Sequence, residues 1–173
     1  PYLSTPYLDS LAKQGTSFTL SYCTSPVCSP SRASLFTGLM PHQHRVEVNS
    51  KPLPEGIPTV GDFLRNSGYE TYYIGKWHIP RCFPEANNEI RGFFNDPVAN
   101  HALGEFTDKE IVEKTIAYLK RPKEKPFFLT ISLQNPHDIC HWITKDKTEY
   151  LEQYSPKSHD ELPPLPANFA INE

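Results

Sequence analysis

The sequence predicts an α/β fold with a doubly wound, largely parallel sheet and helices on both of its faces. Segments with helical periodicity alternate with short segments rich in β formers. Residues 126–133, PFFLTISL, form a continuous apolar run, which is typical of a strand covered on both faces of a parallel sheet. The 173 residues are 38% hydrophobic and 21% charged, a composition that suits one globular domain with its own core.

The start of the chain has the pattern of a helix followed by a strand. Thr5 is a suitable N-cap, Pro6 suits the first helical position, and Gly15 follows the apolar stripe as a stop signal. Residues 16–22, TSFTLSY, alternate between apolar and polar side chains. We therefore expect a helix that begins after Thr5 and ends before Gly15, and a strand over residues 16–22.

A second helix and strand are predicted in the middle of the chain. Residues 59–68, TVGDFLRNSG, gather apolar side chains on one helical face and end at a glycine. Residues 69–74, YETYYI, have the composition of a strand. Prolines cluster in residues 51–58 and 161–169, which we expect to be extended loops, and residues 79–106 are also predicted as loop.

The third predicted pair consists of a helix and the strand formed by the apolar run of residues 126–133. Residues 107–120 begin with a capping box formed by Thr107 and Glu110, and they lead to the strand over residues 126–133. The side chains expected on the buried face of this helix are Ile111, Thr115, Ile116 and Leu119. Helix and strand thus alternate three times, as an α/β architecture requires.

Charge and composition exclude several classes of protein. The net charge is −3, so no overall positive field exists to bind nucleic acid or an anionic membrane surface. No apolar run approaches the roughly 20 residues of a transmembrane helix, and the first residues do not resemble a signal peptide. The four cysteines show neither zinc-ligand spacing nor the pattern of a disulfide framework. Any anion site must therefore be local.

Ionisable side chains follow each of the three predicted strands. Ligands of open α/β sheets bind beyond the carboxyl ends of the strands. Cys28 and Arg32 come after the first strand, Lys76 and His78 after the second, and His137 after the third. We expect these side chains to meet at one rim of the sheet.

The stretch SPVCSPSRASLFTGL, residues 25–39, places a positively charged side chain near the start of a predicted helix, where positive charge is unfavourable. If Ser29 caps the helix and Pro30 takes its first position, Arg32 lies at the third position, where its charge opposes the positive end of the helix dipole. A bound oxyanion would remove this conflict. The same field favours the thiolate of Cys28, a candidate nucleophile, although a buried structural cysteine is the alternative interpretation.

Several of these motifs resemble those of the type I sulfatases. Residues 28–38, CSPSRASLFTG, are similar to the family signature Cys-x-Pro-Ser-Arg followed by Leu-x-Thr-Gly. Residues 68–78, GYETYYIGKWH, resemble the second signature, and residues 5–19 resemble the helix and strand that usually precede the first. The sequence NPHD, residues 135–138, is a weaker match. The resemblance implies an alkaline phosphatase-like fold and a formylglycine-dependent, arylsulfatase-like sulfuric ester hydrolase.

The resemblance also implies a role for each candidate residue. Cys28 would be oxidised by a formylglycine-generating enzyme to an aldehyde, whose hydrate attacks sulfur with one hydroxyl and expels sulfate with the other. Arg32 would steady the formylglycine, and Lys76 would bind a sulfate oxygen. His78 would contact the diol, and His137 would contact sulfate or assist the leaving oxygen. The implied substrate is a sulfated small molecule or glycan.

The metal site of the family is incomplete in this sequence. Members hold a divalent cation, usually calcium, with adjacent aspartates near the N-terminus and a second carboxylate–amide pair further along, and neither pair is present here. Only Cys28, as formylglycine, can be assigned to the metal, and the other ligands are expected outside this chain. We therefore expect residues 1–173 to be a partial sulfatase catalytic domain, an N-terminal section of a larger domain that lacks both metal-binding segments and is inactive alone.

Two alternative functions remain open at this point. Phosphonate and phosphodiester hydrolases of the same superfamily share the first signature, and these residues do not rank sulfate above phosphate esters. A non-catalytic module that binds sulfated ligands through Arg32, Lys76 and His137 is the other alternative.

The histidines outside the motifs are expected to be structural or exposed: His42, His44, His101, His141 and His159. By resemblance alone, the protein is expected in the periplasm, in lysosomes or outside the cell.

Overall fold

The computed structural model describes residues 4–80, 89–98 and 104–140. The chain divides into two compact units, one formed by Tyr22–His141 and the other by Pro1–Ser21 with Trp142–Glu173. The predictions for the proline cluster 161–169 and for His101, His141 and His159 lie outside the described residues. None of the helices within the described ranges has the length and apolar character of a membrane span.

The described part of the smaller unit contains one helix. Helix α1, Pro6–Gln14, confirms the predicted helix with Thr5 in the N-cap position, but the Thr5 hydroxyl forms no capping hydrogen bond with the backbone and donates to the Asp9 carboxylate at 2.9 Å. The strand predicted over residues 16–22 is wrong, since this segment has no regular secondary structure. An alternating segment becomes a strand only where its backbone pairs with a neighbour. No such neighbour lies among the described residues.

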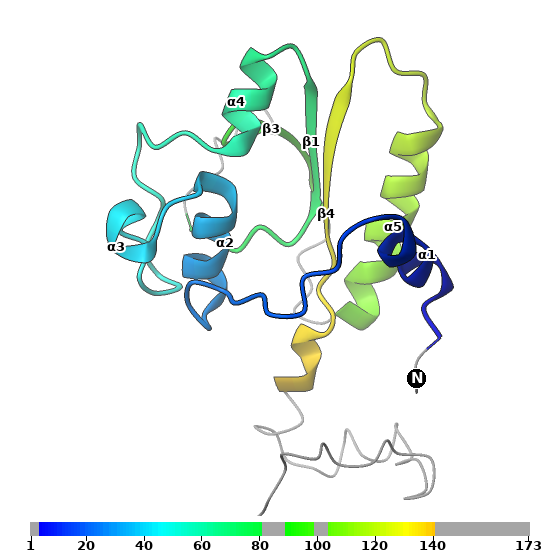
Figure 1. Cartoon of the computed structure of the whole chain (residues 1–173). Coiled ribbons are helices and arrows are strands. Elements are labelled where there is room, and N and C mark those ends of the chain that lie inside the picture. Colours follow the sequence, from blue (N-terminus) through cyan, green and yellow to red (C-terminus); the bar gives the residue numbers. More distant parts are fainter. Residues whose placement is uncertain (1–3, 81–88, 99–103, 141–173) are drawn as a thin grey trace, which may run out of the picture. The chain divides into compact units, whose positions relative to one another are not determined.

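A four-stranded sheet in the order β2-β3-β1-β4 forms the centre of the larger unit (Figure 1). Strand β1, Glu70–Gly75, is parallel to β3, Phe93–Asp96, and to β4, Phe127–Ser132. The short β2, Glu89–Ile90, is antiparallel to β3. The sheet is therefore largely parallel, as predicted.

Strands β2 and β3 correct the prediction of loop over residues 79–106. A two-residue turn joins them, and both of its residues have positive φ, 40° at Arg91 and 81° at Gly92. Turns of this kind match the twist of the flanking strands. The strands have only two and four residues, too few for a periodicity to be detected in the sequence.

Helices cover both faces of the sheet, which confirms the doubly wound architecture. The helices of this unit are α2, Cys28–Thr37, α3, Pro41–His44, α4, Val60–Asn66, α5, Gly104–Lys120, and the 3-10 helix η1, His137–Cys140. Tyr73 of β1 packs in the core on the α2 face, whereas Tyr72 and Ile74 pack against α5. The alternation of side chains along β1 thus builds two separate cores.

Helix α5 differs from its prediction at its start and on its buried face. It begins at Gly104, so Thr107 lies inside the helix, is buried and does not form the predicted N-terminal capping box. The buried side chains of this face include Ile111, Thr115 and Tyr118. Ile116 and Leu119 are 45% and 51% exposed, contrary to prediction. The sequence carries two adjacent apolar stripes, and only the stripe that contains Tyr118 faces the sheet.

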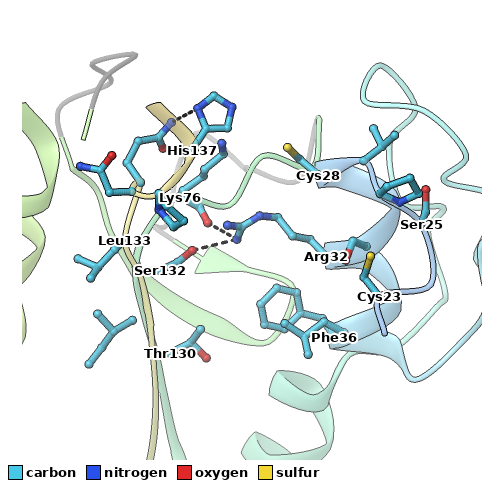
Figure 2. A pocket seen from close by; sticks show the side chains of 18 of the residues that line it. Cys23, Ser25, Cys28, Arg32, Phe36, Lys76, Thr130, Ser132, Leu133 and His137 are labelled. Atoms are coloured by element: carbon cyan, nitrogen blue, oxygen red, sulfur yellow. Dashed lines mark hydrogen bonds between the residues drawn. The ribbon is translucent and has the colours of Figure 1, made fainter. Parts of the chain in front are cut away.

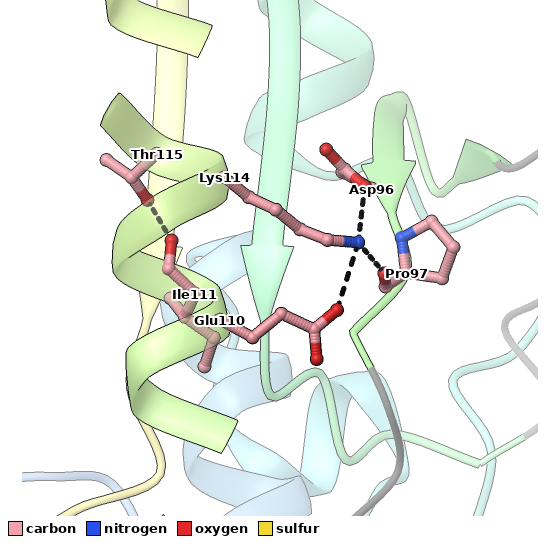
Figure 3. Close-up of polar contacts among 6 residues, drawn as sticks. All are labelled: Asp96, Pro97, Glu110, Ile111, Lys114 and Thr115. Carbon is pink, nitrogen blue, oxygen red and sulfur yellow. Dashed lines mark hydrogen bonds and ion pairs between the residues drawn. The ribbon is translucent and has the colours of Figure 1, made fainter. Parts of the chain in front are cut away.

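An ionic cluster ties α5 to the carboxyl end of β3 (Figure 3). The Lys114 ammonium lies 2.8 Å from the Asp96 carboxylate and 3.3 Å from that of Glu110, and it also donates to the Pro97 carbonyl. Lys114 is only partly exposed, so the cluster is less screened than a surface pair. It fixes α5 at the edge of the sheet where the parallel strands end.

Candidate active site

A cavity of about 600 Å³ opens at the carboxyl ends of β1 and β4 (Figure 2). Its walls are α2 with the segment before it, the end of β1, and β4 with the loop that follows. Four of the predicted site residues line it, namely Cys28, Arg32, Lys76 and His137. His78 is not among the lining residues. The ends of β1 and β4 and the start of α2 therefore bring together side chains that are as much as 109 positions apart in the sequence.

The start of α2 differs from the prediction that Ser29 caps the helix. The helix begins at Cys28, and the residue before it, Val27, provides no side-chain cap. The buried Ser29 instead donates its amide N–H to the Asn49 side-chain oxygen at 2.9 Å and its hydroxyl to the His78 carbonyl. Asn49 therefore satisfies a free N–H of the first turn from a distant part of the chain. Cys28 occupies the first helical position, half-buried on the cavity wall.

Arg32 lies at the fifth position of α2 rather than at the predicted third. Its Nη1 donates to the Lys76 carbonyl at 2.6 Å, to the Ser132 hydroxyl at 2.9 Å and to the Tyr73 hydroxyl at 3.2 Å (Figure 2). These neutral acceptors belong to the ends of β1 and β4. The unfavourable position of Arg32 near the helix start is thus offset within the protein, and the anion inferred from sequence is not needed to explain it.

Lys76 follows directly on β1 and is placed by the backbone of β4. Its N–H donates to the Ser132 carbonyl at 2.9 Å, and the preceding Gly75 has φ of 107°, a conformation that glycine tolerates and other residues rarely adopt. The side chain lines the cavity near His137 (Figure 2). Backbone geometry therefore presents this ammonium group to the cavity.

His137 begins η1 and stands on the opposite wall from Cys28 (Figure 2). Its Nδ1 lies 3.4 Å from the Gln134 side-chain nitrogen and 3.8 Å from the Asp138 carboxylate. A carboxamide N–H donates and so favours an unprotonated Nδ1, whereas the Asp138 carboxylate favours a proton on Nδ1. In the neutral tautomer with its proton on Nε2, and in the protonated ring, His137 can donate a hydrogen bond from Nε2.

His78 stands close to the cationic side chains although it does not line the cavity. Partial burial, followed by the positive charges of Lys76, Arg32 and His137, lowers the pKa of His78 below its ordinary value. His78 also has positive φ, 57°, and its carbonyl holds Ser29 at the start of α2. The cluster of positive charge favours a bound anion over any further cation at this place.

The described residues do not by themselves fit a calcium site. Calcium requires six to eight oxygen ligands, typically with several carboxylates among them. In residues 4–80, 89–98 and 104–140, no group of three or more His, Cys, Asp or Glu side chains is arranged to hold a metal ion. The cavity instead combines a thiol with cationic side chains, an arrangement suited to a tetrahedral oxyanion.

Three residues that the sequence analysis missed hold the site residues in place. Tyr73 and Ser132 accept hydrogen bonds from Arg32, and Asn49 accepts one from Ser29. Tyr73 and Ser132 lie in predicted strands, so their positions near strand ends were available as a signal. Asn49 lies in a loop, and no sequence pattern connects it to α2.

His44 lies beneath α2 and was correctly expected to be structural. It is fully buried, its Nε2 lies 3.0 Å from the Ser34 hydroxyl, and its Nδ1 accepts the Val46 N–H at 3.0 Å. The acceptor role of Nδ1 places the proton of the neutral ring on Nε2. Burial is the main cause that lowers the pKa of His44 from its ordinary value of 6.5.

Acidification is therefore expected to destabilise the protein in part through His44. The folded state binds fewer protons at this ring than the unfolded state does, so the free energy of unfolding falls as the pH drops below about 6.5. Denaturant titrations at about pH 7.5 and about pH 5.5 measure this loss. A His44→Gln variant should lose less stability on acidification than the wild type. His42→Gln, at an exposed position of the same short helix, is the control and should stay close to the wild type, because the charge of His42 is the smallest of the causes that lower the pKa of His44.

Comparison with known proteins places the sequence features in a family. The family model described as Sulfatase matches residues 1–168. The Delta 4,5-hexuronate-2-O-sulfatase of Bacteroides thetaiotaomicron is 34% identical over 96% of this chain and 35% of its own length. An ulvan-active sulfatase of Formosa agariphila is 30% identical over 91% of this chain and 35% of its own length.

A solved structure agrees with these sequence matches. The structure of BT1596, a 2-O GAG sulfatase, has a TM-score of 0.64 and 36% identity, and the match covers 78% of this chain and 30% of that one. The chain thus spans about a third of the length of the relatives it matches.

Proposed function

The chain belongs to the sulfatase family of the alkaline phosphatase superfamily, and from this premise we propose that the protein is a sulfatase, a sulfuric ester hydrolase that uses Cys28 as the source of its nucleophile. The observation that carries the proposal is the convergence of Cys28, Arg32, Lys76 and His137 on one cavity. A sulfate ester gathers negative charge on its oxygens in the transition state, and preorganised positive groups stabilise that charge.

We further propose that the substrates are sulfated carbohydrates. The names of two relatives refer to a hexuronate 2-O-sulfate and to ulvan, and a similar solved structure is described as a 2-O GAG sulfatase. Arg32, Lys76 and His137 line the same cavity, which supports a substrate that carries an anionic group. Sulfate on a sugar hydroxyl is such a group.

Each residue of the proposed site has a separate task. The aldehyde made from Cys28 supplies a hydrated nucleophile, one hydroxyl of which attacks sulfur while the other later releases sulfate. Lys76 binds a sulfate oxygen, and His137 donates from Nε2 to sulfate or to the leaving oxygen. Arg32 braces the strand ends against α2 and so holds the helical turn that carries Cys28. His78 contributes to the diol contact and, through its carbonyl, to the placement of Ser29.

The proposal includes a modification and a metal. Cys28 lines the cavity with a free thiol at the first position of α2, and a formylglycine-generating enzyme is the expected partner that oxidises it. A divalent cation, Ca²⁺ in this family, requires oxygen ligands beyond modified Cys28, and we expect them in parts of the protein other than the described residues. We place the enzyme in the periplasm, in lysosomes or outside the cell.

Release of inorganic sulfate tests the proposed function. The full-length protein, co-expressed with a formylglycine-generating enzyme, is expected to release sulfate from a 2-O-sulfated unsaturated hexuronate disaccharide, and Cys28→Ala should release none. Mass spectrometry of the peptide around Cys28 establishes whether the aldehyde is present. A protein that carries the aldehyde and releases no more sulfate than Cys28→Ala would contradict the proposal. Faster cleavage of a matched phosphodiester would assign the site to phosphate esters instead.

A further inference from the structure

Two aspartates connect the start of α5 to the loop that follows β4. The Asp108 carboxylate accepts the backbone N–H of Gln134 at 2.6 Å with one oxygen and that of Asn135 at 3.0 Å with the other. In the opposite direction, the Asp138 carboxylate accepts the backbone N–H of Gly104 at 2.6 Å. Each segment therefore supplies a carboxylate to the backbone of the other.

The loop held in this way forms one wall of the cavity. The lining residues include the four consecutive residues from Gln134 to His137. Asp108 is not a lining residue, so its contacts reach the cavity only through the backbone of this loop. Hydrogen bonds to an ionised acceptor are about twice as strong as those between neutral groups. The connection therefore restrains the segment immediately before His137.

The two segments are also in close contact. A Cβ atom built at Gly104 would lie 2.6 Å from the Asn135 side-chain nitrogen and 2.6 Å from the Asp108 carboxylate. The side chains of Asn135 and Asp108 thus pack directly over the Gly104 backbone, and a larger residue there would have to displace them. The carboxylates restrain the loop from moving away from α5.

We infer that Asp108 is a positioning residue for His137, acting through the backbone of Gln134 and Asn135. The inference rests on the proposed function, in which His137 contacts the sulfate or the leaving oxygen. By fixing two successive amides, Asp108 sets the direction in which the chain enters η1 and so the place of the imidazole opposite Cys28. The ionic cluster around Lys114 holds the same helix against β3 and supports this arrangement.

A double-mutant cycle on the full-length, formylglycine-containing protein tests this inference. Asp108→Asn retains one acceptor oxygen for two N–H groups, and we expect it to lower kcat/KM by about tenfold to a hundredfold, as a displacement of a catalytic group does. In a His137→Ala background, the same change should cost less than about twofold, because the group that Asp108 positions is already absent. Amide hydrogen exchange at Gln134 and Asn135 should become faster in Asp108→Asn.

Control variants separate positioning from general stability. Glu113→Gln makes the same chemical change at an exposed position of α5 and should leave kcat/KM as in the wild type. Asp108→Glu keeps the charge on a longer side chain, and it carries the test if Asp108→Asn does not fold. Equal losses in the wild-type and His137→Ala backgrounds, or no loss at all, would overturn the inference. Failure of the modified wild type to release sulfate would instead overturn the proposed function.

Discussion

Replacement of Arg32 by lysine is expected to lower kcat/KM for sulfate ester hydrolysis by about 10²-fold to 10³-fold, the loss seen when a preorganised electrostatic group is removed. Arg32 uses one nitrogen to join the Lys76 carbonyl to the Ser132 hydroxyl, and so it spans β1 and β4 from α2. Lysine carries the same charge, but its side chain is shorter and ends in a tetrahedral ammonium, so it does not place a donor where Nη1 lies. The strand ends would lose their common donor, and the cationic group would be displaced from the cavity.

Steady-state kinetics of the modified protein measures this loss, and thermal unfolding shows whether the variant is folded. Arg65→Lys is the matched control. Arg65 lies on α4 and forms an exposed ion pair with Glu89 of β2, so this position should tolerate the change. A loss of less than about tenfold for Arg32→Lys would show that charge alone is sufficient at this position, contrary to the assigned role. The same loss in Arg65→Lys would indicate a general effect of removing arginines.

The sequence predicted the principal features of the fold because they depend on periodicity. Residues 69–74 and 126–133 are observed as β1 and β4, and the helices before each of them are observed as α4 and α5. Features that depend on tertiary partners were predicted less well. Residues 16–22 have the alternation of a strand but no paired neighbour in the described part of the chain, and β2 and β3 are too short to show a period.

The candidate site shows the same division between local and tertiary information. The positions of Lys76 and His137 after β1 and β4 follow from local patterns, whereas the strand expected before Cys28 is not observed, and the structure brings all three to one cavity. The start of α2 did not follow, because its first turn is satisfied by Asn49, 20 residues from Ser29. The partners of Arg32 on β1 and β4 could not be inferred from the sequence, so its charge was interpreted as evidence of a bound anion. Local rules identified the unusual residue but not the contacts that stabilise it.

Substitution of Gly75 by alanine is expected to lower the free energy of unfolding by more than about 4 kcal/mol, a value reached only by severe steric or backbone changes. Gly75 has φ of 107°, and a Cβ atom there would lie 2.1 Å from the Ser132 carbonyl oxygen. This carbonyl cannot withdraw easily, because it accepts the Lys76 N–H and because Gly75 pairs with Ser132 in the sheet. The strain therefore falls on the junction of β1 and β4, where Lys76 and Arg32 meet.

Denaturant unfolding of the full-length protein measures the effect of Gly75→Ala, and Gly38→Ala provides the control. Gly38 ends α2 with φ of 71°, but no atom lies within 4 Å of the added methyl group, so only the left-handed conformation opposes the change. That conformation costs a non-glycine residue about 1–2 kcal/mol. Both glycines have positive φ, but 71° lies close to the left-handed helical region and 107° lies outside it, so the difference between the two variants combines the steric contact with Ser132 and the additional backbone strain at Gly75. Equal destabilisation of the two variants would show that the close approach of β1 and β4 at Gly75 contributes nothing, and that backbone conformation alone explains the glycine.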